Sequence, residues 1–111
     1  MAGWYEVNRA SDGQYRFVLK AGNGEVILNS ELYKTKASAM NGIASVQKNS
    51  PDDVRYERLM SKNDKAYFNL KAANHQVIGT SQLYASVQSR DKGIESVQNN
   101  GSSETIKDQT V

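Results

Sequence analysis

Apolar and polar residues alternate in two stretches that lie far apart in the chain. In the segment YRFVLK, Phe17 and Leu19 fall on one face of a period-two pattern, and in AYFNLK the same holds for Phe68 and Leu70. This alternation is typical of a β-strand that buries one face. The segments WYEVNR, VRYERLM, EVILNS and QVIGTS are rich in aromatic or branched residues and are bounded by turn clusters, so they predict four further strands.

Helical spacing appears after the third and sixth predicted strands. Ala39, Ile43 and Val46 follow one another at i, i+4 and i+7, as expected for one face of an α-helix. Ile94 and Val97 repeat the last two of these positions. We expect Thr35 and Ser86 to cap the first turns of the two helices through their hydroxyl oxygens. The segments Asn49-Ser50-Pro51 and Asn100-Gly101 should end the helices.

The two sets of elements are copies of one another. A shift of 51 positions aligns FVLKAGNGEVILNSELY with FNLKAANHQVIGTSQLY without a gap, and it also aligns GIASVQKN with GIESVQNN. Between residues 17 and 49, 17 of 33 positions are identical to their partners, which indicates an internal duplication. Gly42 and Gly93 recur in the middle of the helices. A glycine there costs about 0.5–1 kcal/mol relative to alanine, so its repetition predicts a close approach between helix and sheet.

These patterns predict an α+β fold in which two repeats share one core. One unit of about 50 residues leaves a sheet face and an edge uncovered and is marginal alone. We therefore expect a single domain over residues 1–111, built of repeats at about 3–50 and 54–107 and joined at Ser50-Pro51-Asp52-Asp53. Both helices should pack on one face of a single sheet. The final segment should add a short strand at 105–107, and the chain should be a monomer with internal pseudo-two-fold symmetry.

Composition narrows the function without defining it. Fourteen Lys and Arg against 12 Asp and Glu give a net charge of +2, too small to indicate nucleic acid or membrane by charge alone. The absence of cysteine excludes disulfides and thiolate chemistry and fits a reducing compartment. No apolar run is long enough to span a membrane, and the first residues do not form a secretory signal. Cytoplasmic localisation is the expectation.

Few residues are candidates for catalysis or metal binding. His75, the single histidine, stands where the first repeat has the turn residue Gly24, so we expect it in a hairpin turn at positive φ. One histidine without cysteine gives no recognisable metal site. The repeated acids Glu6 and Glu57 could form a glycosidase-like pair, but duplication alone explains them. The sequence thus predicts no cofactor, no metal and no enzymatic activity.

A binding face is the more substantial possibility. Lysine and aromatic residues on an uncovered sheet face can hold single-stranded nucleic acid. The alternative is that the lysines are simply solvated and that the two repeated tyrosines cover the helix starts. The residues of this candidate face are Lys20, Lys71, Tyr33, Tyr84, Arg16 and Tyr67.

The doubled pattern F-x-L-K-A-x-N-x-x-V-I-x-x-S-x-L-Y followed by G-I-x-S-V-Q-x-N resembles the YegP-like family of small bacterial proteins, whose domain has no known function. The resemblance covers essentially the whole chain. It implies two β(3)-α-β motifs in one antiparallel sheet, with the last strand of each motif exchanged into the other half. Single-motif relatives reach this arrangement as dimers. No activity, cofactor or catalytic residue comes with the family.

Three classes of function remain open from the sequence. The first is a non-enzymatic module that binds a protein or peptide through the open sheet face or an edge strand. The second is a weak nucleic-acid binder using the repeated Lys and Tyr positions, for which binding should fall steeply with salt. The third is an enzyme or small-molecule binder, which requires a concave pocket with convergent polar groups.

Overall fold

The computed structural model describes residues 3–110 and contains the expected strands and helices. Both helices are 14 residues long and occupy equivalent places in the two repeats. A 3₁₀ turn, η1, precedes the fourth strand. The elements are β1 (Trp4–Arg9), β2 (Tyr15–Lys20), β3 (Val26–Asn29), α1 (Lys36–Asn49), η1 (Asp53–Arg55), β4 (Tyr56–Met60), β5 (Ala66–Lys71), β6 (Val77–Thr80), α2 (Val87–Asn100) and β7 (Ile106–Asp108).

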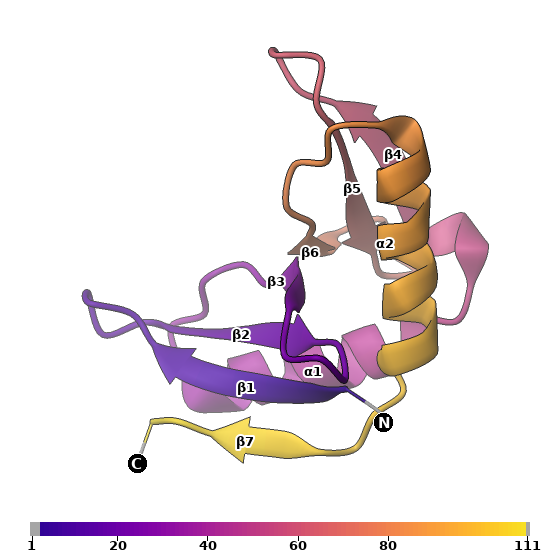
Figure 1. Ribbon diagram of the computed structural model, residues 1–111. Coiled ribbons are helices and arrows are strands. Elements are labelled where there is room, and N and C mark those ends of the chain that lie inside the picture. Colours follow the sequence, from indigo (N-terminus) through magenta and orange to yellow (C-terminus); the bar gives the residue numbers. More distant parts are fainter. Residues whose placement is uncertain (1–2, 111) are drawn as a thin grey trace.

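All seven strands form one sheet in the order β4-β5-β6-β3-β2-β1-β7. Figure 1 shows its two halves, β1 to β3 with β7 and β4 to β6, meeting in the middle at β3 and β6. The strand after α2 crosses to the other half, as the resemblance implies. The sheet is mixed rather than wholly antiparallel, because β7 lies parallel to β1. A helical crossover is the connection that parallel strands require, and α2 is part of it.

The repeats are related by a pseudo-two-fold axis that passes between β3 and β6. These strands are antiparallel, and their paired residues are Asn29 and Thr80. These residues are 51 positions apart, so each is the equivalent of the other in its repeat. The backbone joint between the halves is therefore a pairing of equivalent residues at the axis.

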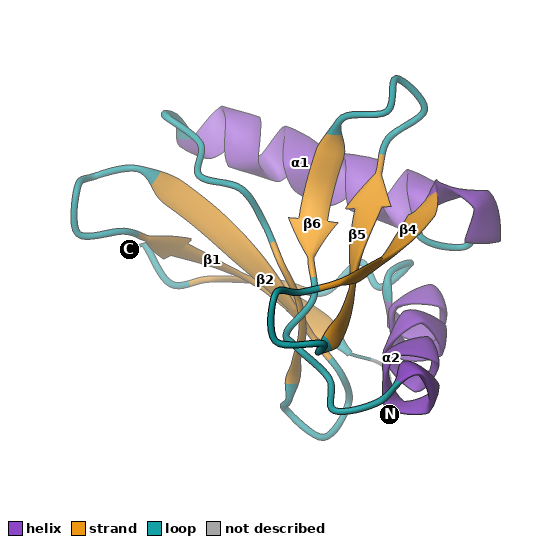
Figure 2. Ribbon diagram, turned by 90° about the horizontal axis from the view of Figure 1, so that it is seen from above, coloured by secondary structure: helices purple, strands orange, loops and turns teal. Residues whose placement is uncertain are grey.

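Both helices contribute to one apolar core on one face of the sheet. Each helix contacts strands of both repeats: α1 packs on β2, β5 and β6, and α2 packs on β5, β3 and β2. Figure 2 shows α1 running beside the strands of the second half. The helical stripes are buried as predicted. Fourteen residues form the core cluster: Tyr5, Val7, Phe17, Leu19, Ile27, Leu28, Ile43, Val46, Tyr56, Phe68, Leu70, Ile78, Ile94 and Val97.

Local interactions of single residues determine the helix starts and the hairpin turns. The hydroxyl oxygen of Thr35 accepts a hydrogen bond from Ser38 N at 3.1 Å, and Ser86 caps α2 in the same way through Ser89 N. His75 has φ 69°, the left-handed conformation that Gly24 has in the first repeat. Histidine tolerates this conformation better than most residues do. The predicted caps and the turn role of His75 are thus confirmed.

The fourth strand begins later than expected. The segment VRYERLM predicted a strand from Val54, but Asp53–Arg55 forms η1 and β4 starts at Tyr56. The carboxylate of Asp52 accepts a hydrogen bond from Val54 N at 3.2 Å. This capping bond gives the backbone a local alternative to strand pairing, which explains the shorter strand.

The pseudo-symmetry is broken at the axis by two pairs of equivalent residues, each with a glycine in the second repeat. A Cβ atom on Gly79 would lie 2.6 Å from two side-chain carbons of Leu28. A Cβ atom on Gly101 would lie 2.1 Å from the hydroxyl oxygen of Ser50. In both pairs the side chain of the first repeat fills space that the glycine leaves free. The two halves are therefore complementary rather than identical at their contact.

We predict strong energetic coupling between Leu28 and Gly79. Leu28→Gly should destabilise the fold by about 3 kcal/mol through the cavity it leaves, and Gly79→Leu by about 2 kcal/mol or more through overpacking. In the transposed double variant the new leucine takes the place of the old one. Its loss of stability should therefore be at least about 1 kcal/mol smaller than the sum of the single losses. Urea unfolding of the four proteins measures this, and additive losses would contradict the complementary packing.

The repeated helix glycines make room for tyrosine side chains and not for the sheet backbone. A Cβ on Gly42 would lie 2.5 Å from Tyr33 Oη, and one on Gly93 would lie 2.3 Å from Tyr84 Oη. We predict that Gly42→Leu and Gly93→Leu each destabilise the protein by well over 1 kcal/mol through overpacking, roughly 2–3 kcal/mol. Ala44→Leu, on the exposed side of α1, is the matched control and should change stability little. An unchanged unfolding midpoint in the glycine variants would disprove this packing.

Candidate functional site

The sheet face opposite the helices carries the repeated charged residues. Tyr5 and Val7 are buried on the helix side, so Glu6 between them lies on the open face. The same alternation places Lys20, Glu57 and Lys71 on this face. Two lysines and two glutamates at equivalent positions therefore lie on the side of the sheet that α1 and α2 leave uncovered.

Each lysine forms an ion pair with the glutamate of its own repeat. Lys20 Nζ lies 3.1 Å from Glu6 Oε2, and Lys71 Nζ lies 3.1 Å from Glu57 Oε2. The second partner of each carboxylate differs. Glu6 accepts a hydrogen bond from Trp4 Nε1 at 2.8 Å, whereas Glu57 accepts one from Asn69 Nδ2 at 3.3 Å. The repeated lysines are consequently not free cations.

These contacts lower the pKa of both glutamates. For Glu6 the hydrogen bond from Trp4 is the largest cause, partial burial opposes it, and Lys20 contributes less. For Glu57 the hydrogen bond from Lys71 is the largest cause, followed by that from Asn69. Both carboxyl groups are thus held in the charged form. The two sites use the same ion pair but are stabilised by different partners.

The structure divides the six residues of the candidate binding face between two sides of the sheet. Arg16 pairs with Asn8 and is exposed on the open face, and Tyr67 is half-buried on the same face. Tyr33 and Tyr84 lie on the helix side. The β-bridges Tyr15↔Tyr33 and Ala66↔Tyr84 determine this placement. The lysines and the repeated tyrosines therefore do not form one surface.

The repeated tyrosines pack against the core. The ring of Tyr33 stacks on Phe17 with 6.2 Å between centroids, and that of Tyr84 stacks on Phe68 at 6.5 Å. Burial is the main reason that the pKa of Tyr33 is raised. These rings cover the helices, as the alternative reading of the sequence expected, but they do so beside Gly42 and Gly93 in the middle of the helices and not at the helix starts.

The sequence did not predict a difference between β1 and β4, the equivalent first strands of the two repeats. β1 is covered along its outer edge by β7, with Tyr5 N donating to Thr105 O and Gln109 N to Val7 O, each at 2.9 Å. β4 is the equivalent of β1, yet within residues 3–110 no strand pairs with its outer edge. The alignment of the repeats contained a signal for this difference. The residues of β7 align with those at the start of β4, so the second repeat has a strand after its helix where the first repeat passes into β4.

The backbone groups exposed at this edge can be identified from the hairpin that follows. Ser61 N donates to Lys65 O at 2.8 Å, toward β5. Because the direction of hydrogen bonding alternates along a strand, Arg58 and Met60 direct their N–H and C=O groups away from β5. The N–H of Tyr56 is bonded to Asp53 O in η1. The available edge therefore runs from the carbonyl of Tyr56 to Met60.

Side chains around this edge are both charged and apolar. Arg58 Nη2 lies 3.0 Å from Asp53 Oδ1, and Arg58 Nε lies 3.7 Å from Asp91 Oδ1 on α2. Met60 and Val54 have 52% and 78% of their surface exposed. An exposed strand edge flanked by apolar side chains is a surface that can accept another strand.

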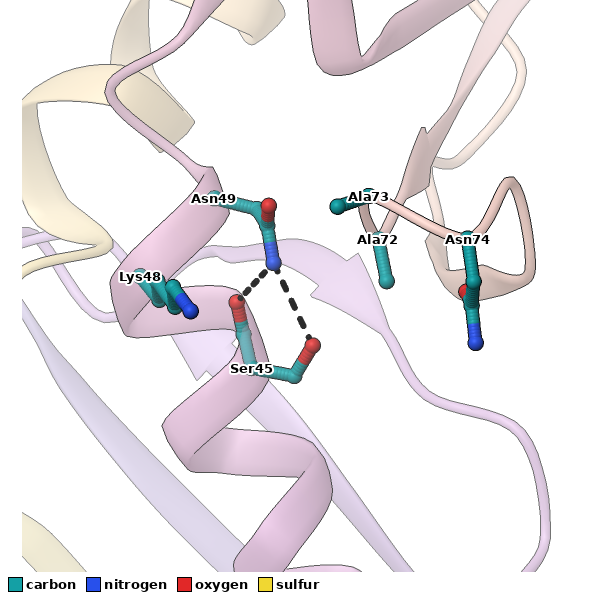
Figure 3. A pocket seen from close by; sticks show the side chains of 6 residues that line it. All are labelled: Ser45, Lys48, Asn49, Ala72, Ala73 and Asn74. Atoms are coloured by element: carbon teal, nitrogen blue, oxygen red, sulfur yellow. Dashed lines mark hydrogen bonds between the residues drawn. The ribbon is translucent and has the colours of Figure 1, made fainter.

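Two shallow depressions lie at the C-terminal ends of the helices. The first, about 270 Å³, is lined by three residues of α1 and by the β5–β6 turn (Figure 3). Asn49 donates to the carbonyl and hydroxyl oxygens of Ser45, so its amide nitrogen is already bonded. The second, about 360 Å³, lies along α2. The first depression is too shallow to enclose a substrate. The small and flexible residues that line it are Ser45, Lys48, Asn49, Ala72, Ala73 and Asn74.

The repeated acids and the histidine lie on separate strands and turns among residues 3–110. Glu6 and Glu57 stand on strands separated by four others, roughly 24 Å apart at a strand spacing of about 4.8 Å, whereas a glycosidase pair requires about 5–10 Å. His75 is exposed in its turn. Within the described part of the chain no cluster of three metal-binding side chains occurs. Neither helix has the length and apolar character needed to cross a membrane.

The fold and the open face define a tandem-repeat α+β protein whose two similar units share one seven-stranded sheet. The family model for the domain of unknown function DUF1508 matches twice, at residues 10–57 and 61–108. The chain therefore belongs to the UPF0339 family, which includes YegP. Each matched unit ends with the strand after its helix, at the start of β4 and at β7.

Similar proteins are found over nearly the full chain. A UPF0339 protein of Acinetobacter baylyi is 80% identical over 110 residues, which cover 99% of each chain. YegP of Escherichia coli K12 is 64% identical, covering 99% of this chain and 100% of YegP. Two solution structures, of YegP from E. coli and of a UPF0339 protein from Shewanella oneidensis, have TM-scores of 0.94 and 0.93 at 64% identity. They cover 99% of this chain and 95% and 93% of those chains.

We predict that removing the two lysines affects the two glutamates unequally. Lys71→Met should return the pKa of Glu57 toward its ordinary value of about 4.3, because Lys71 is the main cause of the shift. Lys20→Met should move the pKa of Glu6 less, since the Trp4 hydrogen bond remains. Carboxyl-carbon NMR titration measures both shifts, and equal shifts would contradict the assigned causes.

The same ion pairs predict how stability depends on pH. A carboxyl group with a lowered folded pKa stabilises the protein above its unfolded value of about 4.3 and loses this contribution as pH falls through the folded pKa. Unfolding stability in the wild type should therefore fall more steeply below pH 5 than in Lys71→Met. Parallel curves for the two proteins would contradict this.

Proposed function

We propose that this protein is a non-enzymatic interaction module that binds an extended segment of a partner protein by strand addition at the outer edge of β4. The observation that carries the proposal is the unequal covering of β1 and β4. At β1 the equivalent edge holds a strand, β7, through main-chain hydrogen bonds of 2.9 Å. The pairing of β7 with β1 is thus an instance, within the same protein, of the strand pairing proposed at β4.

Binding through an edge suits a sheet of this kind. Main-chain hydrogen bonds supply affinity in strand addition, and alternate side chains supply specificity. Arg58 and Met60 provide outward backbone groups, and the exposed side chain of Met60 offers apolar surface beside them. The shallow depressions and the distance between Glu6 and Glu57 support a binding role over a catalytic one.

Nucleic-acid binding is the weaker alternative. Its case rested on lysines and tyrosines acting together on one face, but Lys20 and Lys71 are paired with glutamates. Tyr33 and Tyr84 stack on the core at the other face. A stacking platform for bases requires exposed rings beside free cations. The observed arrangement therefore favours a protein partner.

The edge can be tested with two substitutions at one position. Arg58→Pro removes an outward N–H group without removing a bond to β5, a position that proline tolerates in an edge strand. Arg58→Ala removes the same side chain and keeps the N–H, so it is the matched control. We expect partner capture to fall about tenfold in Arg58→Pro, because a main-chain bond and close approach are lost, and to change little in Arg58→Ala.

The capture should use tagged proteins in lysate of the organism that encodes the chain, divided into nuclease-treated and untreated halves. The folded state of each variant is checked by its unfolding midpoint. A partner that survives nuclease and is lost only from Arg58→Pro supports the proposal. Partners that disappear with nuclease would favour nucleic-acid binding, and equal capture by both variants would place the interface elsewhere.

A further inference from the structure

The pairing of β1 with β7 shows what kind of segment fits such an edge. β7 lies parallel to β1 with Glu6 opposite Lys107 and Val7 opposite Asp108. Lys107 extends over the open face, with its Nζ 4.2 Å from the centre of the Trp4 ring. Ile106 faces the other side and packs against the core. The bound strand thus presents a basic residue toward Glu6 and an apolar residue toward the helices.

The β4 edge has the same acidic residue in the same place. Glu57 is the equivalent of Glu6 and holds its own lysine at the same distance, 3.1 Å. The side chain of Glu57 is 39% exposed, whereas that of Glu6 is 17% exposed. The difference fits the structures of the two edges, because at β1 Trp4 donates a hydrogen bond to the carboxylate and Lys107 lies over the Trp4 ring. Glu57 therefore has room for a second cationic partner.

The helix side of the edge is balanced in charge. Arg58 contacts Asp53 and Asp91, and Arg90 also contacts Asp91, at 3.3 Å. The preference for a cationic side chain therefore comes from Glu57 on the open face. A second copy of the chain is disfavoured, since an antiparallel pair of β4 strands centred on Arg58 would bring two guanidinium groups together.

We propose that the outer edge of β4 binds an extended peptide parallel to it, with a lysine or arginine of the peptide opposite Glu57, as β1 binds β7 with Lys107 opposite Glu6. The inference rests on the proposed function, and it adds the direction, the register and the charge of the partner. Because Asp53 O already accepts the hydrogen bond from Tyr56 N, the peptide pairs with the edge from the Tyr56 carbonyl onward to Met60.

The probe is a synthetic peptide with the sequence Ser-Glu-Thr-Ile-Lys-Asp-Gln-Thr, that of residues 103–110, blocked at both ends. A second peptide carries the change Lys107→Glu. The full isotope-labelled chain is titrated with each peptide and followed by amide NMR. The tethered β7 keeps its place on β1 because its effective concentration is in the millimolar range, so peptide at lower concentration reports on β4.

We expect the lysine peptide to shift the amides of Arg58 and Met60, to leave those of Val7 and Arg9 unchanged, and to bind at least about threefold more tightly than the glutamate peptide. In Glu57→Gln the ratio of the affinities for the lysine and glutamate peptides should fall to about one. Glu6→Gln, the equivalent change at the covered edge, should keep it. A nitroxide at the C-terminus of the peptide should broaden Met60 and Ser61 more than Asp53, as a parallel strand requires.

The other outcomes each overturn a definite part of the proposal. Equal binding of both peptides at Arg58 and Met60 would leave strand addition standing and disprove the lysine opposite Glu57. Broadening at Asp53 would disprove the parallel direction. Shifts at Val7 would show exchange with β7 instead. Shifts that follow protein concentration without peptide would identify a second copy as the occupant. No shift at Arg58 and Met60 up to millimolar peptide would remove the site and, with it, the function proposed for the edge.

Discussion

The narrow joint between the two halves of the sheet is the constraint on which the rest of the structure depends. β3 and β6 are paired at Asn29 and Thr80, so few backbone hydrogen bonds hold the halves together. The helices supply the remaining cohesion, because each packs on strands of both repeats. Tyr5 Oη donates to Gly101 O and Tyr56 Oη to Ser50 O, at 2.7 and 2.8 Å. Each bond fastens the end of one helix to the first strand of the other half, and burial raises the pKa of both tyrosines, which keeps them as donors.

Covalent linkage of the repeats permits a contact that a symmetric pair of units cannot make. On a two-fold axis identical residues meet, so two leucines at position 28 would compete for one space and two glycines would leave it empty. The tandem chain places Leu28 against Gly79 and Ser50 against Gly101. Close packing at the axis is obtained by divergence between the repeats. The sequence differences that look like drift in an alignment are, at these positions, part of the packing.

The sequence predicted what depends on local chemistry and missed what depends on how the halves meet. Helix caps at Thr35 and Ser86, the turn at His75 and the buried helical stripe follow from residue type and spacing, and all are confirmed. Tyr33 could not be placed, because its face is determined by a bridge to Tyr15 across the hairpin. The parallel direction of β7 was equally hidden, since it arises from a crossover between repeats. The open face was foreseen, whereas the ion pairs that neutralise its lysines were not.

The uncovered edge of β4 is a consequence of the duplication itself. The segment after α2 is free to cross to the other half and lie beside β1. The equivalent segment after α1 is already used, since it forms η1 and the start of β4. The strand after α2, β7, therefore covers the edge of β1, whereas the strand after α1, β4, itself forms an edge of the sheet. Val7 of β1, which pairs with β7, is apolar. Its equivalent in β4 is Arg58, a charged residue of the kind that limits unspecific pairing at exposed edges. The edge thus discourages indiscriminate association while its backbone groups remain available to a segment of complementary charge.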